Sequence, residues 1–363
     1  MEKPKIGISK FNNIGGVTCY MNSILAILQQ TPIFTDYILN GLFKENLLKN
    51  YHDKNKDPTE CIDSPIYQLY ILLKSSHEND NINITPTSFR RVITMKDEMW
   101  GQQQQQDSQE FLTFLLSQLE SEVSTKVNFI GGCKIESNTL SKNDNLIQIL
   151  AQSNWIQYIK NEYSLIKMLF TGMTRMTTTC KYCSNQTNNF DIFQTLQLSL
   201  SLKNNINQKF TLEDCLDHYT ENELLDKHNM MKCNFCYRKN QSTKKTVLWK
   251  TPKILILHIK RFIVNYLGVP TQKLNNMVEY PMNLNIKNYI DPLSPYYKDT
   301  DYKLFGINCH HSLGSKQTIN SGHYTSIVKN RYDDCWYEFD DNHVRDTDNI
   351  VNGKAYMLFY ELN

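Results

Sequence analysis

Cys19 is the cysteine of this chain best placed to act as a nucleophile. It follows a turn-forming segment, residues 12–16, and it opens an apolar pattern of helical period that runs to about residue 30. A cysteine at the N-terminus of a helix lies at the positive end of the helix dipole, which stabilises its thiolate. Because a lone cysteine is more often a small buried hydrophobic residue, the assignment depends on a partner base and on a group that orients that base.

His323 is the strongest candidate for the base among the nine histidines of the chain. It follows Gly322, which allows another segment to approach closely, and it opens a strand-like pattern. His258 lies inside an apolar strand and is expected to be a core residue. His310 and His311 end another predicted strand, where they are candidates for lining a cleft.

An acidic pair, Asp340 and Asp341, follows His323 by one predicted hairpin. Adjacent antiparallel strands would place Asp340 against the imidazole, where a carboxylate fixes the tautomer and stabilises the imidazolium. Because neighbouring side chains of an extended segment point to opposite faces, only one of the two aspartates can face the ring squarely. The simpler alternative is a turn, in which consecutive aspartates are common.

Four further cysteines have the spacing of a metal site. They form two C-x-x-C pairs, Cys180 with Cys183 and Cys233 with Cys236. Two such pairs complete a tetrahedral zinc site, and four thiolates leave no open position for catalysis, so we expect one structural Zn²⁺ per chain. The pairs are too far apart for a compact zinc ribbon, and separate hairpins must bring them together. The alternative is two unrelated turns with reduced thiols.

Length and composition exclude several classes of function. The chain has 363 residues, of which 40% are hydrophobic and 21% charged, an ordinary globular composition. Its formal net charge of +2 gives no electrostatic footprint for nucleic acid or for an anionic membrane, so we expect neither as a partner. No apolar stretch is long enough to span a bilayer, and no apolar segment typical of a secretory signal follows Met1. We therefore expect an intracellular protein, cytoplasmic, nuclear or both.

The elements that must position these residues change character along the chain. The first part has helical patterns and the second part has strand-like alternation, which predicts an α+β protein with an antiparallel sheet. Helices are predicted at 18–30, 66–73, 108–123 and 212–225, and strands at 170–179, 193–202, 254–259, 302–309, 324–329, 336–339 and 355–360. Residues 49–64 are loop-like, and the weak pattern of residues 128–161 indicates an insertion or a mobile connection.

Six segments resemble, in the same order, the sequence motifs of the ubiquitin-specific proteases, and the resemblance runs from about residue 7 to the end. The matching segments are residues 15–23 (cysteine box), 105–112 (glutamine–aspartate segment), the two C-x-x-C pairs (zinc-binding fingers), 252–262 and 355–360 (palm strands), and 321–324 with 336–341 (histidine box). Because several separate motifs agree in type and order, the resemblance is highly specific.

The resemblance implies a papain-like cysteine protease fold in one catalytic domain, residues 7–363. A helical thumb would cover about 7–165, and zinc-bearing fingers with an antiparallel palm would cover about 166–363. The implied activity is deubiquitination, the hydrolysis of the bond after the C-terminal glycine of ubiquitin. Cys19 would be the nucleophile, His323 the base, and Asp340 its orienter. The implied partners are ubiquitin and ubiquitinated proteins, and we expect a monomer.

The same resemblance suggests residues that touch the substrate. Gln106 and Asp107 fall in the glutamine–aspartate segment, and Asp107 is suited to a charge-assisted contact with basic residues of the ubiquitin tail. The family's asparagine stands five residues before the cysteine, where this chain has Ile14, and Asn13 is one residue earlier. We expect Asn13 to reach the oxyanion through a bulged turn, with the N–H of Cys19 as a second donor and Asp341 assisting on that side.

Two alternatives remain open from the sequence alone. The first is a catalytically weak or inactive ubiquitin-binding protein of the same fold, which the altered turn before Cys19 mildly favours. The second is a zinc-ribbon nucleic-acid binder, for which the net charge of +2 provides no basic patch.

Overall fold

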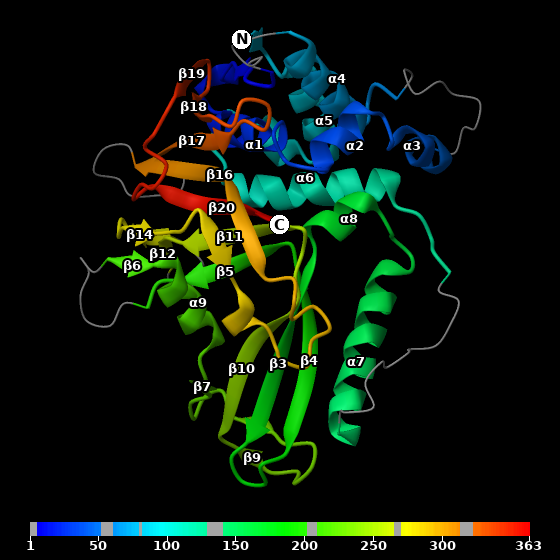
Figure 1. Cartoon of the computed structure of the whole chain (residues 1–363), viewed down its shortest axis with the longest axis vertical. Helices are drawn as coiled ribbons and strands as arrows, with labels where there is room; N and C mark the ends of the chain where they lie inside the picture. Colours follow the sequence, from blue (N-terminus) through cyan, green and yellow to red (C-terminus); the bar gives the residue numbers. More distant parts are fainter. Residues whose placement is uncertain are drawn as a thin grey trace.

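The computed structural model describes residues 6–51, 61–79, 82–128, 141–201, 209–264, 270–312 and 322–363. Helices gather at one end, a large sheet crosses the middle, and long strands extend away from it (Figure 1). The predicted α+β class is confirmed. Of the predicted connections, residues 52–60 and 129–140 lie outside the described residues.

The helical end is built around α1 (Cys19–Leu28), in which every residue is buried. Three predicted helices are confirmed as α1, α4 (Pro65–Glu78) and α6 (Ser108–Val123). Side chains cap the start of two of these helices. Ser64 accepts a hydrogen bond from the N–H of Tyr67 at α4, which has proline at its first position, and Asp107 accepts two from backbone N–H groups at α6. The smaller helices of this end are α2 (Phe34–Leu39), α3 (Lys44–Asn50), α5 (Thr87–Lys96) and α8 (Leu165–Phe170).

The large sheet carries the strands predicted in the second part of the chain, except the one predicted at 170–179, which lies in a second sheet. Its order is β19-β18-β17-β16-β20-β11-β5, with β15 also pairing with β16. The strands are β5 (Thr195–Ser199), β11 (Ile254–Lys260), β15 (Asn283–Asn285), β16 (Asp301–Ser312), β17 (Gly322–Lys329), β18 (Trp336–Asp340), β19 (His343–Asp346) and β20 (Ala355–Leu362). The expected antiparallel pairing is correct except that β5 pairs with β11 in parallel.

Both faces of this sheet are covered. In β11, Ile254 and Ile256 belong to the core shared with α1 and α6, while Leu255 and Leu257 belong to a second core on the opposite face. A strand that is buried on both faces reads as a continuous apolar run, as residues 254–259 do. The sheet therefore holds the helical end on one side and the smaller strands and α9 (Leu212–Thr220) on the other.

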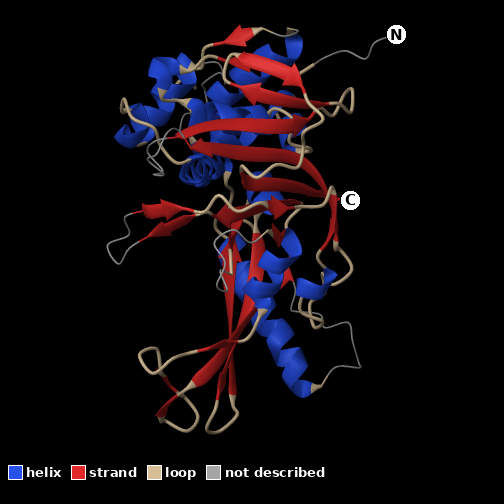
Figure 2. Ribbon diagram, turned by 90° about the vertical axis from the view of Figure 1, so that its left-hand side faces the viewer, coloured by secondary structure: helices blue, strands red, loops and turns tan. Residues whose placement is uncertain are grey.

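A second, four-stranded sheet projects away from the first, with α7 (Lys142–Ile159) along one side of it (Figure 2). Its order is β4-β3-β10-β7. The strands are β3 (Gly172–Cys180), β4 (Gln186–Phe193), β7 (Glu223–Leu224) and β10 (Ser242–Lys250). The remaining described strands form two-stranded pairs: β1 (Lys10–Phe11) with β2 (Asn83–Ile84), β6 (Phe210–Thr211) with β14 (Val278–Glu279), β8 (Met231–Lys232) with β9 (Lys239–Asn240), and β12 (Phe262–Val264) with β13 (Pro270–Lys273).

Two predictions about this region are wrong. Residues 142–159 are not a mobile connection but helix α7, because Ala151, Trp155 and Ile159 pack against Met173, Phe190 and Trp249 in a third core. The helix predicted over 212–225 ends at Thr220, and Glu223–Leu224 instead pairs with β10. Among the described residues, no helix combines the length and the apolar character needed to cross a bilayer.

Candidate active site

Cys19 is the first residue of α1 and is fully buried. The segment before it forms the bulged turn expected from the position of Asn13, one residue earlier than the family's asparagine. Gly15 and Gly16 both have left-handed backbones in this turn, with φ of 66° and 71°. This turn brings the side chain of Asn13 back over the helix start, where its Oδ1 accepts a hydrogen bond from the N–H of Thr18 at 2.8 Å. The N–H of Cys19 points out of the first turn of a helix, where no intrahelical acceptor exists.

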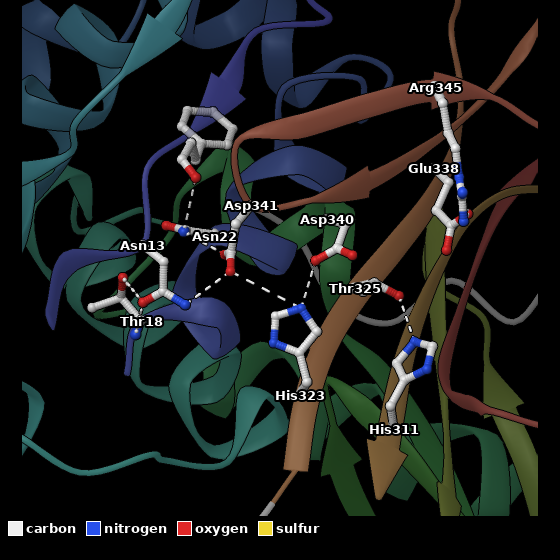
Figure 3. A network of polar contacts seen from close by, with 11 residues as sticks. Asn13, Thr18, Asn22, His311, His323, Thr325, Glu338, Asp340, Asp341 and Arg345 are labelled. Atoms are coloured by element: carbon white, nitrogen blue, oxygen red, sulfur yellow. Dashed lines mark hydrogen bonds and ion pairs between the residues drawn. The ribbon is translucent and has the colours of Figure 1, made fainter. Parts of the chain in front are cut away.

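His323 and Asp340 meet because their strands, β17 and β18, are antiparallel neighbours. Nε2 of His323 lies 2.6 Å from Oδ1 of Asp340 (Figure 3). This hydrogen bond, together with the neighbouring side chain of Cys19, raises the pKa of His323 to about 10 against the opposing effect of burial. The same bond lowers the pKa of Asp340. Because Nε2 faces Asp340, Nδ1 is the ring nitrogen available to the thiol of Cys19.

Asp341 lies beside the ring but is held by two asparagines. Its Oδ2 accepts a hydrogen bond from Nδ2 of Asn13 and its Oδ1 accepts one from Nδ2 of Asn22, both at 2.8 Å (Figure 3). Its Oδ2 lies 4.0 Å from Nε2 of His323. The backbone of Asp341 is left-handed, with φ of 52°, a conformation that lets consecutive aspartates aim in different directions.

Asn22 was not identified by the sequence reasoning. A signal for it was available, because Asn22 stands three residues after Cys19 and so shares its helical face. It is 3% exposed, and its Nδ2 also donates to the carbonyl of Phe11 at 3.1 Å. Its Nδ2 therefore has two acceptors, whereas its buried Oδ1 has no hydrogen-bond partner among the described residues.

Asp107 has partners other than those expected. It is 5% exposed and begins α6, where its Oδ1 accepts hydrogen bonds from the N–H groups of Gln109 and Glu110. Its Oδ2 accepts from the hydroxyls of Tyr356 at 2.5 Å and Tyr324 at 3.4 Å. Burial raises the pKa of Asp107. Both oxygens are thus occupied within the protein, and a direct contact with a basic ubiquitin tail stays a prediction.

The two glutamines before Asp107 differ in their contacts. Nε2 of Gln106 donates to the carbonyl of Met99 at 3.4 Å, and its side chain is partly buried. Oε1 of Gln105 accepts a hydrogen bond from the N–H of Gly322 at 3.0 Å. Gln105 therefore ties the glutamine–aspartate segment to the residue directly before His323, a contact that the sequence reasoning did not anticipate.

Two other histidines near this site, His258 and His310, are buried core residues. His258 is buried as expected, with its ring centroid 4.6 Å from that of Tyr356, and burial lowers its pKa to about 3. The expectation that His310 lines a cleft is wrong, because it is 1% exposed and burial lowers its pKa to about 3. The position of His310 also explains why residue 322 is a glycine, because a Cβ atom at that position would lie 2.1 Å from Nε2 of His310. His311 is partly buried, and its Nε2 lies 2.8 Å from Oγ1 of Thr325.

The four cysteines predicted as metal ligands come together at the far end of the four-stranded sheet. In the first pair, Cys180 ends β3 and Cys183 lies in the turn to β4. The second pair lies in the turn between β8 and β9, so separate hairpins supply the two pairs. All four Sγ atoms lie within 4.8 Å of one another, with Sγ of Cys183 3.6 Å from Cys233 and Sγ of Cys180 4.0 Å from Cys236. Tetrahedral zinc with four thiolates gives sulfur separations of about 3.8 Å. This group can hold a metal ion.

Comparison with known proteins identifies the family. The family model described as "Ubiquitin carboxyl-terminal hydrolase" matches residues 9–360. The chain belongs to the ubiquitin carboxyl-terminal hydrolase family. Usp2 of Drosophila melanogaster is 31% identical over 360 residues, which is 98% of this chain and 35% of that protein. Human ubiquitin carboxyl-terminal hydrolase 2 is 29% identical over 368 residues, 99% of this chain and 56% of that protein. The chain thus spans about a third to a half of these relatives.

Solved structures of the SAGA deubiquitinating module share the fold. The SAGA Ubp8/Sgf11/Sus1/Sgf73 deubiquitinating module bound to ubiquitin aldehyde matches with a TM-score of 0.72 at 22% identity, over 100% of this chain and 71% of that one. In the terms used for the family, the helical end is the thumb, the large sheet is the palm, and the four-stranded sheet with the Cys₄ group forms the fingers. The predicted papain-like fold is confirmed.

Proposed function

We propose that this chain is a cysteine-type deubiquitinase, which hydrolyses the peptide or isopeptide bond after the C-terminal glycine of ubiquitin. The observation that carries the proposal is the hydrogen bond of 2.6 Å between His323 and Asp340. It lies beside Cys19 at the start of α1, in a chain that belongs to this family. Two of the structurally similar modules are described as bound to ubiquitin or ubiquitin aldehyde, which supports ubiquitin as the partner.

The proposed reaction uses a thiolate–imidazolium pair. The Cys19 thiolate attacks the carbonyl carbon after the last glycine, a C–S bond forms, and the carbonyl π electrons move to the oxygen. The tetrahedral intermediate collapses, the C–N bond breaks, and the leaving amine takes a proton from Nδ1 of His323. Water then attacks the thioester carbonyl, His323 takes a proton from it, and the C–S bond breaks to release the carboxyl group and the Cys19 thiolate.

Two N–H groups are proposed to stabilise the oxyanion. One is the backbone N–H of Cys19, and the other is the second N–H of the Asn13 side-chain amide, whose first N–H is bonded to Asp341. Asp341 would act by fixing the rotamer of that amide. The alternative of an inactive ubiquitin-binding protein was based on the displaced asparagine. It loses its main support, because the bulged turn carries Asn13 back to the helix start.

Several finer assignments belong to the same proposal. We assign the ion of the Cys₄ group as one structural Zn²⁺, because the sulfur separations suit tetrahedral coordination. A role for Gln106 and Asp107 on the side of the ubiquitin tail stays a prediction, because both oxygens of Asp107 are bonded within the protein. The division into a thumb at about 7–165 and fingers with palm at about 166–363, the monomeric state, and an intracellular location in cytoplasm or nucleus all stay predictions.

A labelling experiment tests the activity. The wild-type chain should react with ubiquitin-vinyl sulfone, a probe that captures a nucleophilic cysteine, and should cleave at least one linkage in a panel of di-ubiquitins. The Cys19→Ala variant should do neither while still binding ubiquitin. Binding of ubiquitin by the wild-type chain without labelling or cleavage would instead favour the inactive alternative.

A further inference from the structure

The tip of the fingers exposes an unusual group of aromatic side chains. Tyr182, Phe235 and Tyr237, the fingertip aromatics, are 57%, 54% and 74% exposed. They lie within or next to the two C-x-x-C turns, hereafter the two knuckles. A single exposed aromatic residue needs no explanation, but several in one small region mark an interaction site.

The two knuckles present these rings in equivalent ways. In the first knuckle, the N–H of Ser184 donates to the carbonyl of Cys180, and in the second the N–H of Tyr237 donates to that of Cys233, both at 2.9 Å. Ser184 and Tyr237 have matching left-handed backbones, with φ of 58° and 57°. Tyr182 and Phe235 each stand two residues after the first cysteine of their knuckle. The knuckles therefore form a rigid, repeated support for aromatic faces.

Basic residues accompany these rings in both knuckles, and one of them contacts a ring. Four exposed basic residues, the fingertip cations, lie on the knuckles and their flanking residues: Lys181, Lys232, Arg238 and Lys239. The guanidinium carbon of Arg238 lies 4.2 Å from the ring centroid of Tyr182, so a cation of one knuckle stacks on the aromatic of the other. Within the described part of the chain, none of the four forms a salt bridge.

The local charge is positive although the whole chain is nearly neutral. No aspartate or glutamate occurs in residues 176–190 or 227–240. A divalent ion with four thiolates is a net dianion, and Asp226, one residue before the second segment, adds one negative charge, so the four fingertip cations leave a small positive balance. The expectation that nucleic acid is not a partner rested on the net charge of +2. That number sums over the whole chain, so acidic residues elsewhere cancel the basic residues of the fingertip.

We propose that the fingertip binds single-stranded nucleic acid, with bases stacked on the fingertip aromatics and phosphates held by the fingertip cations. Single strands are recognised by this combination, because every base offers a flat π-face and every nucleotide carries a phosphate. An acidic peptide would satisfy the cations but would leave the rings without stacking partners. A duplex has its bases stacked internally and could use only the cations.

Fluorescence anisotropy with labelled oligonucleotides tests the proposal on the metal-loaded full chain. The probes are single-stranded oligo(dT) and oligo(rU), which separate DNA from RNA, and a duplex of equal length. Binding through four phosphates should weaken by about 50-fold between about 50 and about 200 mM salt. Tyr237→Ala should weaken single-strand binding by at least about fivefold, whereas Tyr237→Phe should retain it because the ring remains.

Matched controls exclude general effects. Tyr163→Ala and Lys160→Ala remove an exposed aromatic and an exposed cation outside the fingertip and should leave binding unchanged. Metal content should be the same in every variant. Absence of single-strand binding by the wild type, equal affinity for duplex, or equal loss in Tyr163→Ala would overturn the proposal. A rise in KM for a ubiquitin substrate in Tyr237→Ala, without oligonucleotide binding, would also overturn it and assign the fingertip to a protein partner.

Discussion

Nδ2 of Asn13 donates a hydrogen bond to Oδ2 of Asp341 at 2.8 Å, although 328 residues separate the two. The contact joins the turn before the proposed nucleophile to the strand end that carries the proposed orienter of His323. Because Asn22 occupies the other oxygen, the carboxylate of Asp341 is fixed on the side of Cys19. Asp340 is thus the aspartate that bonds His323, at 2.6 Å, while Asp341 lies 4.0 Å from the same ring nitrogen.

The first prediction separates the two aspartates by pH dependence. A nearby carboxylate favours the protonated imidazole and raises its pKa, so removing the carboxylate lowers it. The thiolate–imidazolium pair is lost as pH rises through the pKa of His323, which is raised to about 10. Asp340→Ala should therefore move the alkaline limb of the kcat/KM profile to lower pH. Asp341→Asn should reduce kcat and leave that limb in place.

The measurement is the kcat/KM profile of each variant with ubiquitin-AMC across both limbs. If Asp341→Asn alone displaces the alkaline limb, the two roles must be exchanged. Glu338→Gln is a useful control, because Glu338 lies on β18 close in sequence to the pair and is bonded to Arg345 and not to His323.

The second prediction concerns the nucleophile. Cys19→Ala should reduce turnover by about 10⁴-fold or more, the usual loss on removing a triad member. Its melting temperature should stay close to that of the wild type, because the change at this buried site removes only one sulfur atom. Cys335→Ala, at an exposed cysteine, is the matched control. Near wild-type cleavage by Cys19→Ala would show that another residue attacks the substrate.

The parts of the site that the sequence predicted are those that depend on local chain geometry. Cys19 stands at a predicted helix start, Gly322 and His323 open a predicted strand, and the knuckles are compact turns. The contacts that were missed join distant segments. Asn22 with Asp341, and Gln105 with Gly322, are separated by 319 and 217 residues, and only the packing of the thumb on the palm brings them together.

The errors in the fold have similar physical causes. Helix α7 was missed because its apolar residues do not gather on one face: Leu146 and Leu150 are exposed while Trp155 and Ile159 are buried. Its position depends on a core formed with the fingers sheet, which no local pattern reveals. Likewise, alternation in residues 193–202 predicts a half-buried strand but carries no information on whether β5 pairs in parallel.

The third prediction assigns Gln105 as a positioning residue. Its Oε1 fixes the N–H of Gly322, next to His323. Gln105→Ala should lower kcat by about tenfold, on the order of one lost hydrogen bond, with little change in KM. Gln105→Glu retains an acceptor and should restore most of the rate, which a general packing role would not explain. Gln104→Ala, at an exposed neighbour, should have no effect. Equal losses in Gln105→Ala and Gln105→Glu would argue against this role.

The fourth prediction concerns the metal. Elemental analysis of protein purified without chelator should find one zinc per chain, and Cys233→Ser should reduce that content. Because structural zinc contributes folding energy directly, chelation should raise hydrogen exchange in β3, β4 and β10 before it does so in α1 or α6. Cys335→Ser controls for the loss of a thiol outside the group. Finding no zinc, or finding that the thumb exchanges first, would contradict the assignment.

The fifth prediction asks whether Asp107 acts on the substrate or within the protein. Its carboxylate begins α6 and accepts from the hydroxyls of Tyr324 and Tyr356, so Asp107→Ala removes a helix cap and leaves two buried hydroxyls without this partner. These losses together should cost about 3 kcal/mol and lower the melting temperature markedly. Asp107→Asn keeps a capping oxygen without the charge and should be destabilised less.

The KM of Asp107→Asn decides between the two roles. If Asp107 only positions α6 and β17, this variant should show a lower melting temperature with an almost unchanged KM for ubiquitin-AMC. If the carboxylate instead contacts basic residues of the ubiquitin tail, removing its charge should raise KM while the melting temperature stays near that of the wild type. Glu110→Gln supplies the control, because it neutralises an exposed carboxylate on the first turn of the same helix. The burial of Asp107 and its four hydrogen-bond donors favour the first outcome.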